Sequence, residues 1–180
     1  MRRREETCCF TGHRPEKLPW GYDESDERCV RLKRRLRDAV ESAYEAGKRH
    51  FICGMARGCD FYFAEAVLEL RRGHPDITLE AAIPCAGQSS RWRAVEQLRW
   101  ADLVARCDLE TLVQEHYTRG CMLRRNRYMV DHSSLVIAVY DGSSGGTRRT
   151  LEYAFQRGVP CLDIPPAASD GALPPQSERN

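Results

Sequence analysis

The chain has 180 residues, enough for one domain with a substantial core and too few for two domains of ordinary size. Its 28 basic and 26 acidic side chains nearly balance, so the charge gives no reason to expect a nucleic-acid-binding protein. The most apolar stretch, 135–140, is far shorter than the ~20 residues that span a bilayer, and segment 1–6 leads into no signal-peptide core. We therefore expect a cytoplasmic protein without membrane association.

The first half of the chain alternates between short apolar runs, typical of strands, and longer runs with apolar residues at three- and four-residue steps, typical of helices. Polar capping residues and glycines separate these runs and predict where each helix begins and ends. In chain order we predict a strand at 7–10, a helix that starts at the caps 23–25 and ends at 47, a strand at 50–53, a helix from about 60 to 72 and a strand at 77–83.

The second half continues the same alternation. We predict a helix at 92–107, a weak strand at 109–113, a helix at 121–131, a strand at 135–140, a helix from 146 to 158 and a closing strand at 159–164. Beyond the pair Pro165-Pro166 the composition turns to Pro, Ala, Ser and Gly with charges. We therefore expect residues 1–164 to form a single domain and 165–180 a disordered tail.

The alternation of strands and helices predicts an α/β fold with a doubly wound, mainly parallel sheet and helices on both faces. Ligands of such folds bind at the carboxyl ends of the strands, where the following helices begin. Four segments are expected to meet at this edge, namely 11–14, 54–60, the start of the helix at 121 and 145–147.

Nine cysteines are present, an odd number, without a Cys-x-x-Cys or His-x-x-x-His pattern, so we predict no metal site. Four of them, Cys8, Cys9, Cys53 and Cys161, fall in predicted strands. A free thiol packs there as a small apolar side chain, and we expect the cysteines to be reduced core residues.

The turn Gly145-Gly146-Thr147 stands between the most apolar strand and a helix. A helix N-terminus offers unpaired N–H groups and partial positive charge, and glycine lets a ligand approach the backbone. The turn therefore indicates a phosphate or nucleotide site, although a plain strand–helix connection would need the same glycines.

The loop from Gly54 through Gly58 to Asp60 is a second glycine-containing connection at the same edge. It matches neither the Gly-x-Gly-x-x-Gly fingerprint nor a P-loop, and we expect no cofactor. Asp60 is interpreted either as a helix N-cap or as a contact to a sugar hydroxyl.

Arg125 shares a predicted helix face with Met122 and Met129. A guanidinium on this otherwise apolar face binds an anion near the helix start, or packs its stem on the core with its head in water. Asn126 is its expected hydrogen-bonding companion.

The turn after the first strand contributes four further candidates for ligand contact or turn stabilisation: Thr11, Gly12, His13 and Arg14.

Four motifs together resemble the SLOG superfamily, and within it the YpsA-like family of small, uncharacterised bacterial proteins. The resemblance covers residues 7–164 and rests on Thr11-Gly12-His13-Arg14, on 54–60, on 125–131 and on Gly145-Gly146-Thr147. It implies a Rossmann-like fold with a pocket for a nucleotide or a nucleotide derivative. The superfamily also includes the LOG-type phosphoribohydrolases and the DNA-processing protein A domain.

The resemblance leaves three functions open. The first is binding of a nucleotide-derived small molecule, as a sensor in stress or conflict signalling. The second is N-glycosidic hydrolysis of a nucleotide, in which Arg125 and Glu152 match the catalytic arginine and glutamate of the LOG enzymes. The glycine turn lacks the prolines of those enzymes. The resemblance therefore supports a similar pocket in this chain better than it supports the same activity. The third is nucleic-acid binding, suggested by the DNA-processing relatives and by the basic run 28–37, although such a run is more typical of a solvated helix face. Relatives in the superfamily often self-associate, so a homo-oligomer is possible.

Overall fold

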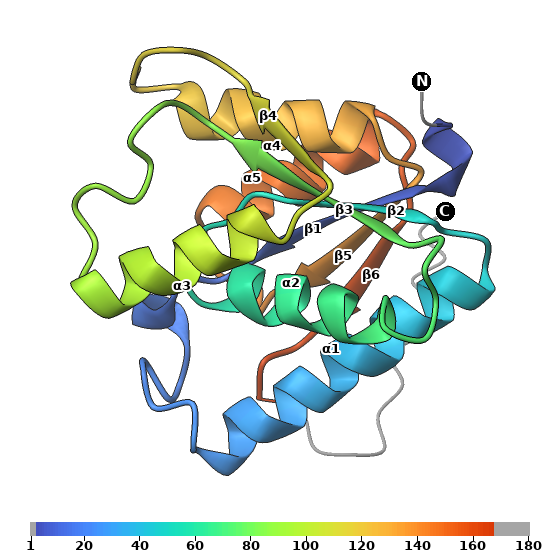
Figure 1. Ribbon diagram of the computed structural model, residues 1–180, viewed down its shortest axis with the longest axis horizontal. Helices are drawn as coiled ribbons and strands as arrows, with labels where there is room; N and C mark the ends of the chain where they lie inside the picture. The colour runs from blue at the N-terminus through green and yellow to red at the C-terminus, as the bar shows by residue number, and fades with distance from the viewer. Residues whose placement is uncertain (1–2, 168–180) are drawn as a thin grey trace.

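The computed structural model describes residues 3–167, so the predicted tail lies almost entirely outside the described residues. A six-stranded sheet in the order β4-β3-β2-β1-β5-β6 forms the centre of the molecule (Figure 1). Every neighbouring pair of strands is parallel. The reversal of strand order beside β1 is the doubly wound arrangement, and the predicted Rossmann-like α/β fold is confirmed.

The strands and helices agree closely with the periodicity of the sequence. The strands are β1 Thr7–Gly12, β2 His50–Cys53, β3 Thr78–Ile83, β4 Leu109–Leu112, β5 Leu135–Val139 and β6 Cys161–Ile164. The helices are α1 Glu27–Glu45, α2 Cys59–Leu70, α3 Ala94–Ala105, α4 Cys121–Asp131 and α5 Gly146–Gln156, with short 3-10 helices η1 Arg4–Glu6 and η2 Pro15–Lys17. Within residues 3–167, no helix combines the length and the apolar character needed to cross a membrane.

Helices cover both faces of the sheet, α1 to α3 on one side and α4 with α5 on the other (Figure 1). Successive residues of a strand point to opposite faces, so Cys8 and Phe10 enter the core beneath α1 and α2, whereas Cys9 faces α4 and α5. Both faces of the central strands are therefore buried, which explains their continuous apolar runs.

Three details differ from the sequence prediction. The first helix begins at Glu27 rather than at 23–25, because the Asp26 side chain accepts a hydrogen bond from the Arg28 amide and caps it. Trp92 precedes α3 instead of belonging to it, and packs against the core with Trp100. Cys161 is exposed rather than buried, because β6 is an edge strand. The other eight thiols are buried or half-buried, and all nine are free.

Candidate functional site

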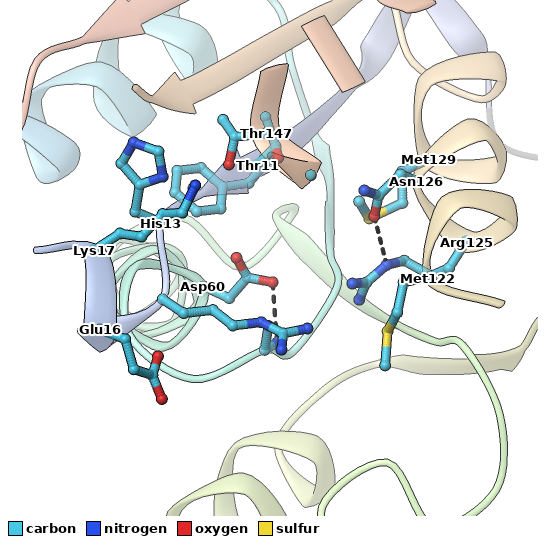
Figure 2. A pocket seen from close by; sticks show the side chains of 15 residues that line it. Thr11, His13, Glu16, Lys17, Asp60, Met122, Arg125, Asn126, Met129 and Thr147 are labelled. Carbon is cyan, nitrogen blue, oxygen red and sulfur yellow. Dashed lines mark hydrogen bonds between the residues drawn. The ribbon is translucent and has the colours of Figure 1, made fainter. Parts of the chain in front are cut away.

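A cavity of about 290 Å³ lies at the carboxyl edge of the sheet, between the exit of β1 and the starts of α2, α4 and α5 (Figure 2). Nine of the predicted site residues line it: Thr11, Gly12, His13, Arg14, Asp60, Arg125, Asn126, Gly146 and Thr147. The sequence prediction missed the six other residues of the lining, Phe10, Glu16, Lys17, Ala56, Met122 and Met129. The remaining predicted residues, Gly54, Gly58, Gly145 and Glu152, lie outside the lining.

The first turn of α5 faces this cavity with no side chain capping it. Its N-cap, Gly145, has φ 146° and ψ −162°, a region essentially restricted to glycine, so the backbone itself requires this glycine. Gly146 is different, because its φ is ordinary and a Cβ there would meet no atom within 4 Å. The Thr147 hydroxyl has no hydrogen-bond partner within residues 3–167, and the first amides of a helix have no partner within the helix.

Lys17 brings a positive charge to the same turn. Its Nζ donates a hydrogen bond to the carbonyl of Ser144, and a Cβ on Gly145 would lie 2.7 Å from this nitrogen. Lys17 ends η2, three residues after Arg14. In the sequence, Lys17 could have been recognised as a basic residue three positions after Arg14, between Pro15 and Pro19.

Arg125 is buried on α4 and reaches the loop that follows β2. Its Nη1 donates to the carbonyls of Gly54 and, at 3.4 Å, Ala82, and its Nε donates to Asn126 Oδ1 at 2.8 Å. Burial lowers the pKa of the guanidinium, partly offset by the nearby Asp60 carboxylate. The guanidinium head therefore lies out of water, and its Nη2 has no hydrogen-bond partner in the described part of the chain.

Asn126 connects Arg125 to the glycine turn. Its Nδ2 donates to the Thr150 hydroxyl at 2.8 Å, and this hydroxyl donates to the Gly146 carbonyl at 2.9 Å. The chain of hydrogen bonds orients the Asn126 amide and couples α4 to the first turn of α5.

Asp60 occupies the second position of α2, whose N-cap is Gly58, so Asp60 is not the N-cap. Its Oδ2 accepts a hydrogen bond from the Ala56 amide at 3.0 Å and so holds the loop in which buried Met55 has φ +52°. Burial raises the pKa of Asp60 from 3.8 to about 6. Its Oδ1 has no hydrogen-bond partner among the residues that the structure describes.

Gly12 and Gly58 let the exits of β1 and β2 pack together. A Cβ on Gly12 would lie 2.7 Å from Cys59 Cβ, and one on Gly58, whose φ is +81°, would lie 2.9 Å from Pro15 Cδ. These glycines are explained by packing and backbone conformation, whether or not a ligand touches Gly12.

His13 and Arg14 have different environments although they are neighbours. His13 is buried, and its Nε2 lies 2.7 Å from Asp141 Oδ1, which joins the exits of β1 and β5. Hydrogen bonds from Ser143 and then from His13 hold the pKa of Asp141 well below its ordinary value. Arg14 is exposed and has no ion pair or side-chain hydrogen bond within residues 3–167, so its charge remains available.

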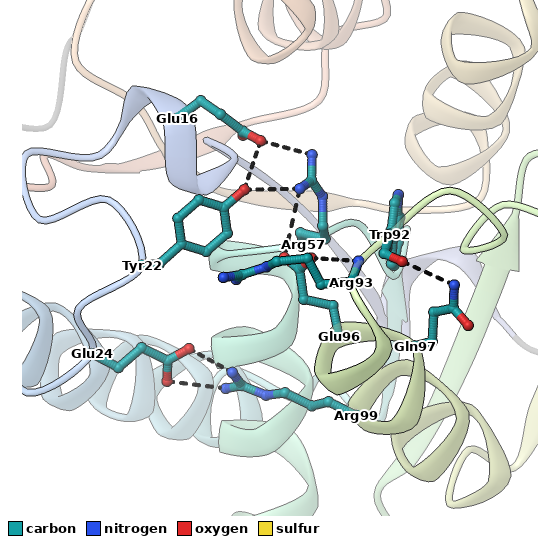
Figure 3. Close-up of polar contacts among 9 residues, drawn as sticks. All are labelled: Glu16, Tyr22, Glu24, Arg57, Trp92, Arg93, Glu96, Gln97 and Arg99. Atoms are coloured by element: carbon teal, nitrogen blue, oxygen red, sulfur yellow. Dashed lines mark hydrogen bonds and ion pairs between the residues drawn. The ribbon is translucent and has the colours of Figure 1, made fainter.

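Arg57 contacts Glu16 of η2, the short helix that also contains Lys17 (Figure 3). Its guanidinium donates to Glu16 Oε1 at 2.8 Å and to the Tyr22 hydroxyl at 2.9 Å, and lies 3.6 Å from Glu96. The glycine loop is thus tied both to η2 and to the start of α3.

Glu152 points away from these groups. It is exposed, and its Oε1 accepts a hydrogen bond from Arg148 Nε at 2.8 Å, one helical turn earlier on α5. The structure therefore brings Arg125 to the cavity but leaves Glu152 outside its lining.

Gly54 leaves room for the Arg125 guanidinium, because a Cβ there would lie 2.4 Å from Arg125 Cζ. We expect Gly54→Ala to displace this buried charge from the Gly54 carbonyl and to lower the free energy of unfolding by about 1–3 kcal/mol. Urea denaturation measures it, with Gly73→Ala as the control, since a Cβ there would meet nothing closer than 3.9 Å. Equal stabilities of the two variants would contradict the proposed close approach.

Comparison with known proteins identifies the family. The model described as "YspA SLOG family" (YpsA) matches residues 8–157. The SPbeta prophage-derived protein YoqJ of Bacillus subtilis is 32% identical over 138 residues, which cover 69% of this chain and 81% of that protein. A UPF0398 protein of Staphylococcus epidermidis is 24% identical over 138 residues, with 76% of this chain and 73% of that protein covered.

Solved structures of DNA processing protein A share the fold. The protein from Helicobacter pylori, whose single-stranded DNA binding mode has been described, superposes with a TM-score of 0.60 and 15% identity over 93% of this chain and 67% of that one. The protein from Streptococcus pneumoniae gives 0.59 and 16% over 97% of this chain, which spans only about half (54%) of that one. The fold, the four motifs and the family match agree, and the chain belongs to the YpsA family of the SLOG superfamily.

Proposed function

We propose that this protein binds a small nucleotide-derived ligand, with a phosphate group and a ribose, in the cavity at the carboxyl edge of the sheet. The observation that carries this proposal is a set of polar groups without partners in residues 3–167 that line one cavity. They are the side chains of Thr11, Arg14 and Thr147, Arg125 Nη2 and Asp60 Oδ1. Apart from the exposed Arg14, these groups belong to buried residues, whose polar atoms are normally paired, and a ligand would pair them.

The phosphate is assigned to the side of the cavity at α5. The amides of Gly146 and Thr147 point out of the uncapped helix end, and Lys17 stands at the same turn. Arg14, which has no ion pair within residues 3–167, adds a second positive charge to the lining. Helix N-termini with nearby cations are a recurrent arrangement for phosphate.

The sugar and the base are assigned to the opposite side. Asp60 Oδ1 is a hydrogen-bond acceptor for a ribose hydroxyl, and Met122 and Met129 offer polarizable apolar surface for a base. The volume of about 290 Å³ is at the lower end of the range for small-molecule pockets, which favours a ligand of mononucleotide size.

We infer binding rather than hydrolysis as the function. The glutamate that the hydrolytic alternative requires, Glu152, pairs with Arg148 outside the cavity lining. Should the ligand be cleaved, the carboxylates that line the cavity are Asp60 and Glu16.

A ligand screen tests this proposal. Melting temperatures of the full chain are measured with AMP, ADP, ADP-ribose, NAD and cyclic nucleotides, and each mixture is analysed by mass spectrometry for released base. A ligand at about 100 times its Kd should stabilise the protein by about 2.7 kcal/mol and be recovered intact. Released base would establish the hydrolytic alternative instead, and no stabilisation by any of these compounds would contradict nucleotide binding.

Nucleic-acid binding is the second candidate, because the structural neighbour from Helicobacter pylori binds single-stranded DNA. The basic run of α1 supports it poorly, since acidic neighbours neutralise much of its charge. The ion pairs are Arg28 with Asp26, Arg31 with Glu27, Lys33 with Glu24 and Arg37 with Glu69.

We expect weak binding of a fluorescent oligothymidylate by this protein, measured by anisotropy at 50 and 200 mM salt. A protein that contacts 6–10 phosphates would lose roughly 10³–10⁵ in affinity between these concentrations. Tight binding with such a salt dependence would favour the DNA-binding function over the nucleotide site.

A further inference from the structure

Two cysteine side chains contact each other beside the proposed ligand site. Cys85 Sγ lies 3.9 Å from Cys121 Sγ, and both residues are buried. Theirs is the one hydrogen bond between two thiols in the described part of the chain. The two cysteines are 36 positions apart in sequence, so this contact is a product of the tertiary fold.

One cysteine stands just after the end of β3 and the other at the start of α4. Cys85 follows β3 by two residues, and Cys121 is the first residue of α4. The segments that carry them already run together, since the Val113 amide donates to the Ile83 carbonyl at 2.8 Å and the Ala86 amide to the Glu115 carbonyl at 3.3 Å. The segment around Cys85 is therefore tied to residues 113–115, which lie six to eight residues before Cys121.

The helix that begins at Cys121 carries one wall of the cavity. Met122 is the next residue, and Arg125 follows one turn later with its guanidinium fitted against the Gly54 carbonyl. A displacement of the first turn of α4 would change this wall, because packed interiors do not absorb shifts without moving their neighbours.

We propose that Cys85 and Cys121 are a redox modification site, at which a peroxide converts the two thiols into a reversible disulfide that draws the start of α4 toward the exit of β3. The formation of the disulfide is independent of the proposed function. Its consequence, weaker ligand binding, rests on the proposed function.

The chemistry needs one peroxide and no other reactant. The Cys121 thiolate attacks one peroxide oxygen, the O–O bond breaks, and the leaving hydroxide takes up a proton as water. Cys85 then attacks the sulfenic sulfur of Cys121, its thiol proton leaves with the displaced hydroxide as a second water, and the S–S bond forms. Two thiols lose two electrons and the peroxide is reduced.

The order of attack follows from the surroundings of each thiol. Burial, and then the hydrogen bond with Cys121, raise the pKa of Cys85, so Cys85 stays protonated. Cys121, the first residue of α4, is therefore the thiol assigned to the first attack. Closing the bond requires the sulfurs to approach from 3.9 Å to about 2.0 Å. The connections 84–93 and 113–120 lie outside helices and strands and supply this movement.

Peptide mapping tests the disulfide. The full chain with Cys161→Ser, which removes the exposed thiol, is treated with hydrogen peroxide, alkylated with N-ethylmaleimide under denaturing conditions and digested with trypsin. Cys85 and Cys121 fall in tryptic peptides 73–91 and 120–124, each with a single cysteine. We expect these two peptides to be linked, with the other cysteines alkylated, and the link to disappear after dithiothreitol. Alkylated Cys85 and Cys121, or a link between any other pair, would overturn the proposal.

A Cys85→Ala variant in the same background is the matched control. Cys121 should then stop at the sulfenic acid, which dimedone traps, because its partner is missing. A Cys121 that becomes linked to another cysteine at the same rate would show that the contact with Cys85 does not direct the reaction.

The consequence for binding is measured with ADP as the probe, by calorimetry on reduced and oxidised protein. We expect at least a fivefold weaker affinity after oxidation, restored by dithiothreitol. An unchanged affinity in linked protein would overturn the regulatory part alone. If ADP binds neither form and no other nucleotide of the screen stabilises the protein, the proposed function fails, while the peptide map still decides the disulfide.

Discussion

Substitution of Gly146 by valine is expected to weaken ADP binding at least a hundredfold and to leave the stability of the protein nearly unchanged. The position has an ordinary φ and open space where a Cβ would lie, so the fold tolerates a side chain. The space that the side chain fills is the cavity in front of the α5 amides, where we place the phosphate. A hundredfold loss corresponds to about 2.7 kcal/mol of binding free energy. Calorimetric titration and urea denaturation measure the two effects separately.

Gly120→Val is the matched control. Gly120 likewise stands at a helix start, as the N-cap of α4, and a Cβ there would also meet no atom within 4 Å, but it does not line the cavity. Its affinity for ADP should equal that of the unmodified protein. Equal affinities of the Gly146 and Gly120 variants would remove the glycine turn from the site.

Substitution of Asp60 by asparagine is expected to stabilise the protein at pH 8 and not at pH 4. Burial raises the pKa of Asp60 from 3.8 to about 6, so the folded protein holds a proton that the unfolded chain has released. Asparagine keeps an oxygen that can accept the hydrogen bond from the Ala56 amide, but it carries no charge to bury.

The sign and the size follow from proton linkage. A raised folded-state pKa contributes stability that is complete below pH 3.8 and is lost as the pH rises through 6. The shift corresponds to about 3 kcal/mol, so Asp60→Asn should exceed the unmodified protein by up to that amount at pH 8. Urea denaturation of both proteins at pH 4, 6 and 8 gives the difference. If the difference in stability between the two proteins does not change with pH, ionisation of Asp60 does not destabilise the folded state.

The same variant separates the sugar from the phosphate. Asp60→Asn should bind ADP about tenfold more weakly, because the carboxylate is replaced by a poorer acceptor for a ribose hydroxyl. Its affinity for inorganic phosphate should be unchanged, since the phosphate is assigned to the α5 turn. An equal loss for both ligands would place Asp60 at the phosphate instead. A residue that costs stability and serves binding is typical of functional sites.

The motifs at the strand ends were predicted more accurately than the roles of their residues. Strand and helix periodicity located nearly every element, since each face of the sheet and each helix buries a continuous apolar stripe. The two glycine loops were recognised, yet Gly54 and Gly58 owe their identity to Arg125 and Pro15, which approach from other elements. Such approaches cannot be inferred from the loop alone, because the approaching atoms are 71 and 43 residues away in the sequence.

The order of apolar and polar residues along the chain was sufficient to predict the doubly wound parallel sheet, because periodicity and chain connectivity are local properties. The sheet in turn determines the edge at which its loops converge. Family membership likewise followed from the four motifs and their spacing. Only the tertiary structure decided which side chains share the cavity. It turned Glu152 outward to Arg148, brought Lys17 over the glycine turn and placed Cys85 against Cys121. Contacts of this kind depend on distances between elements remote in sequence, which packing of the whole core sets.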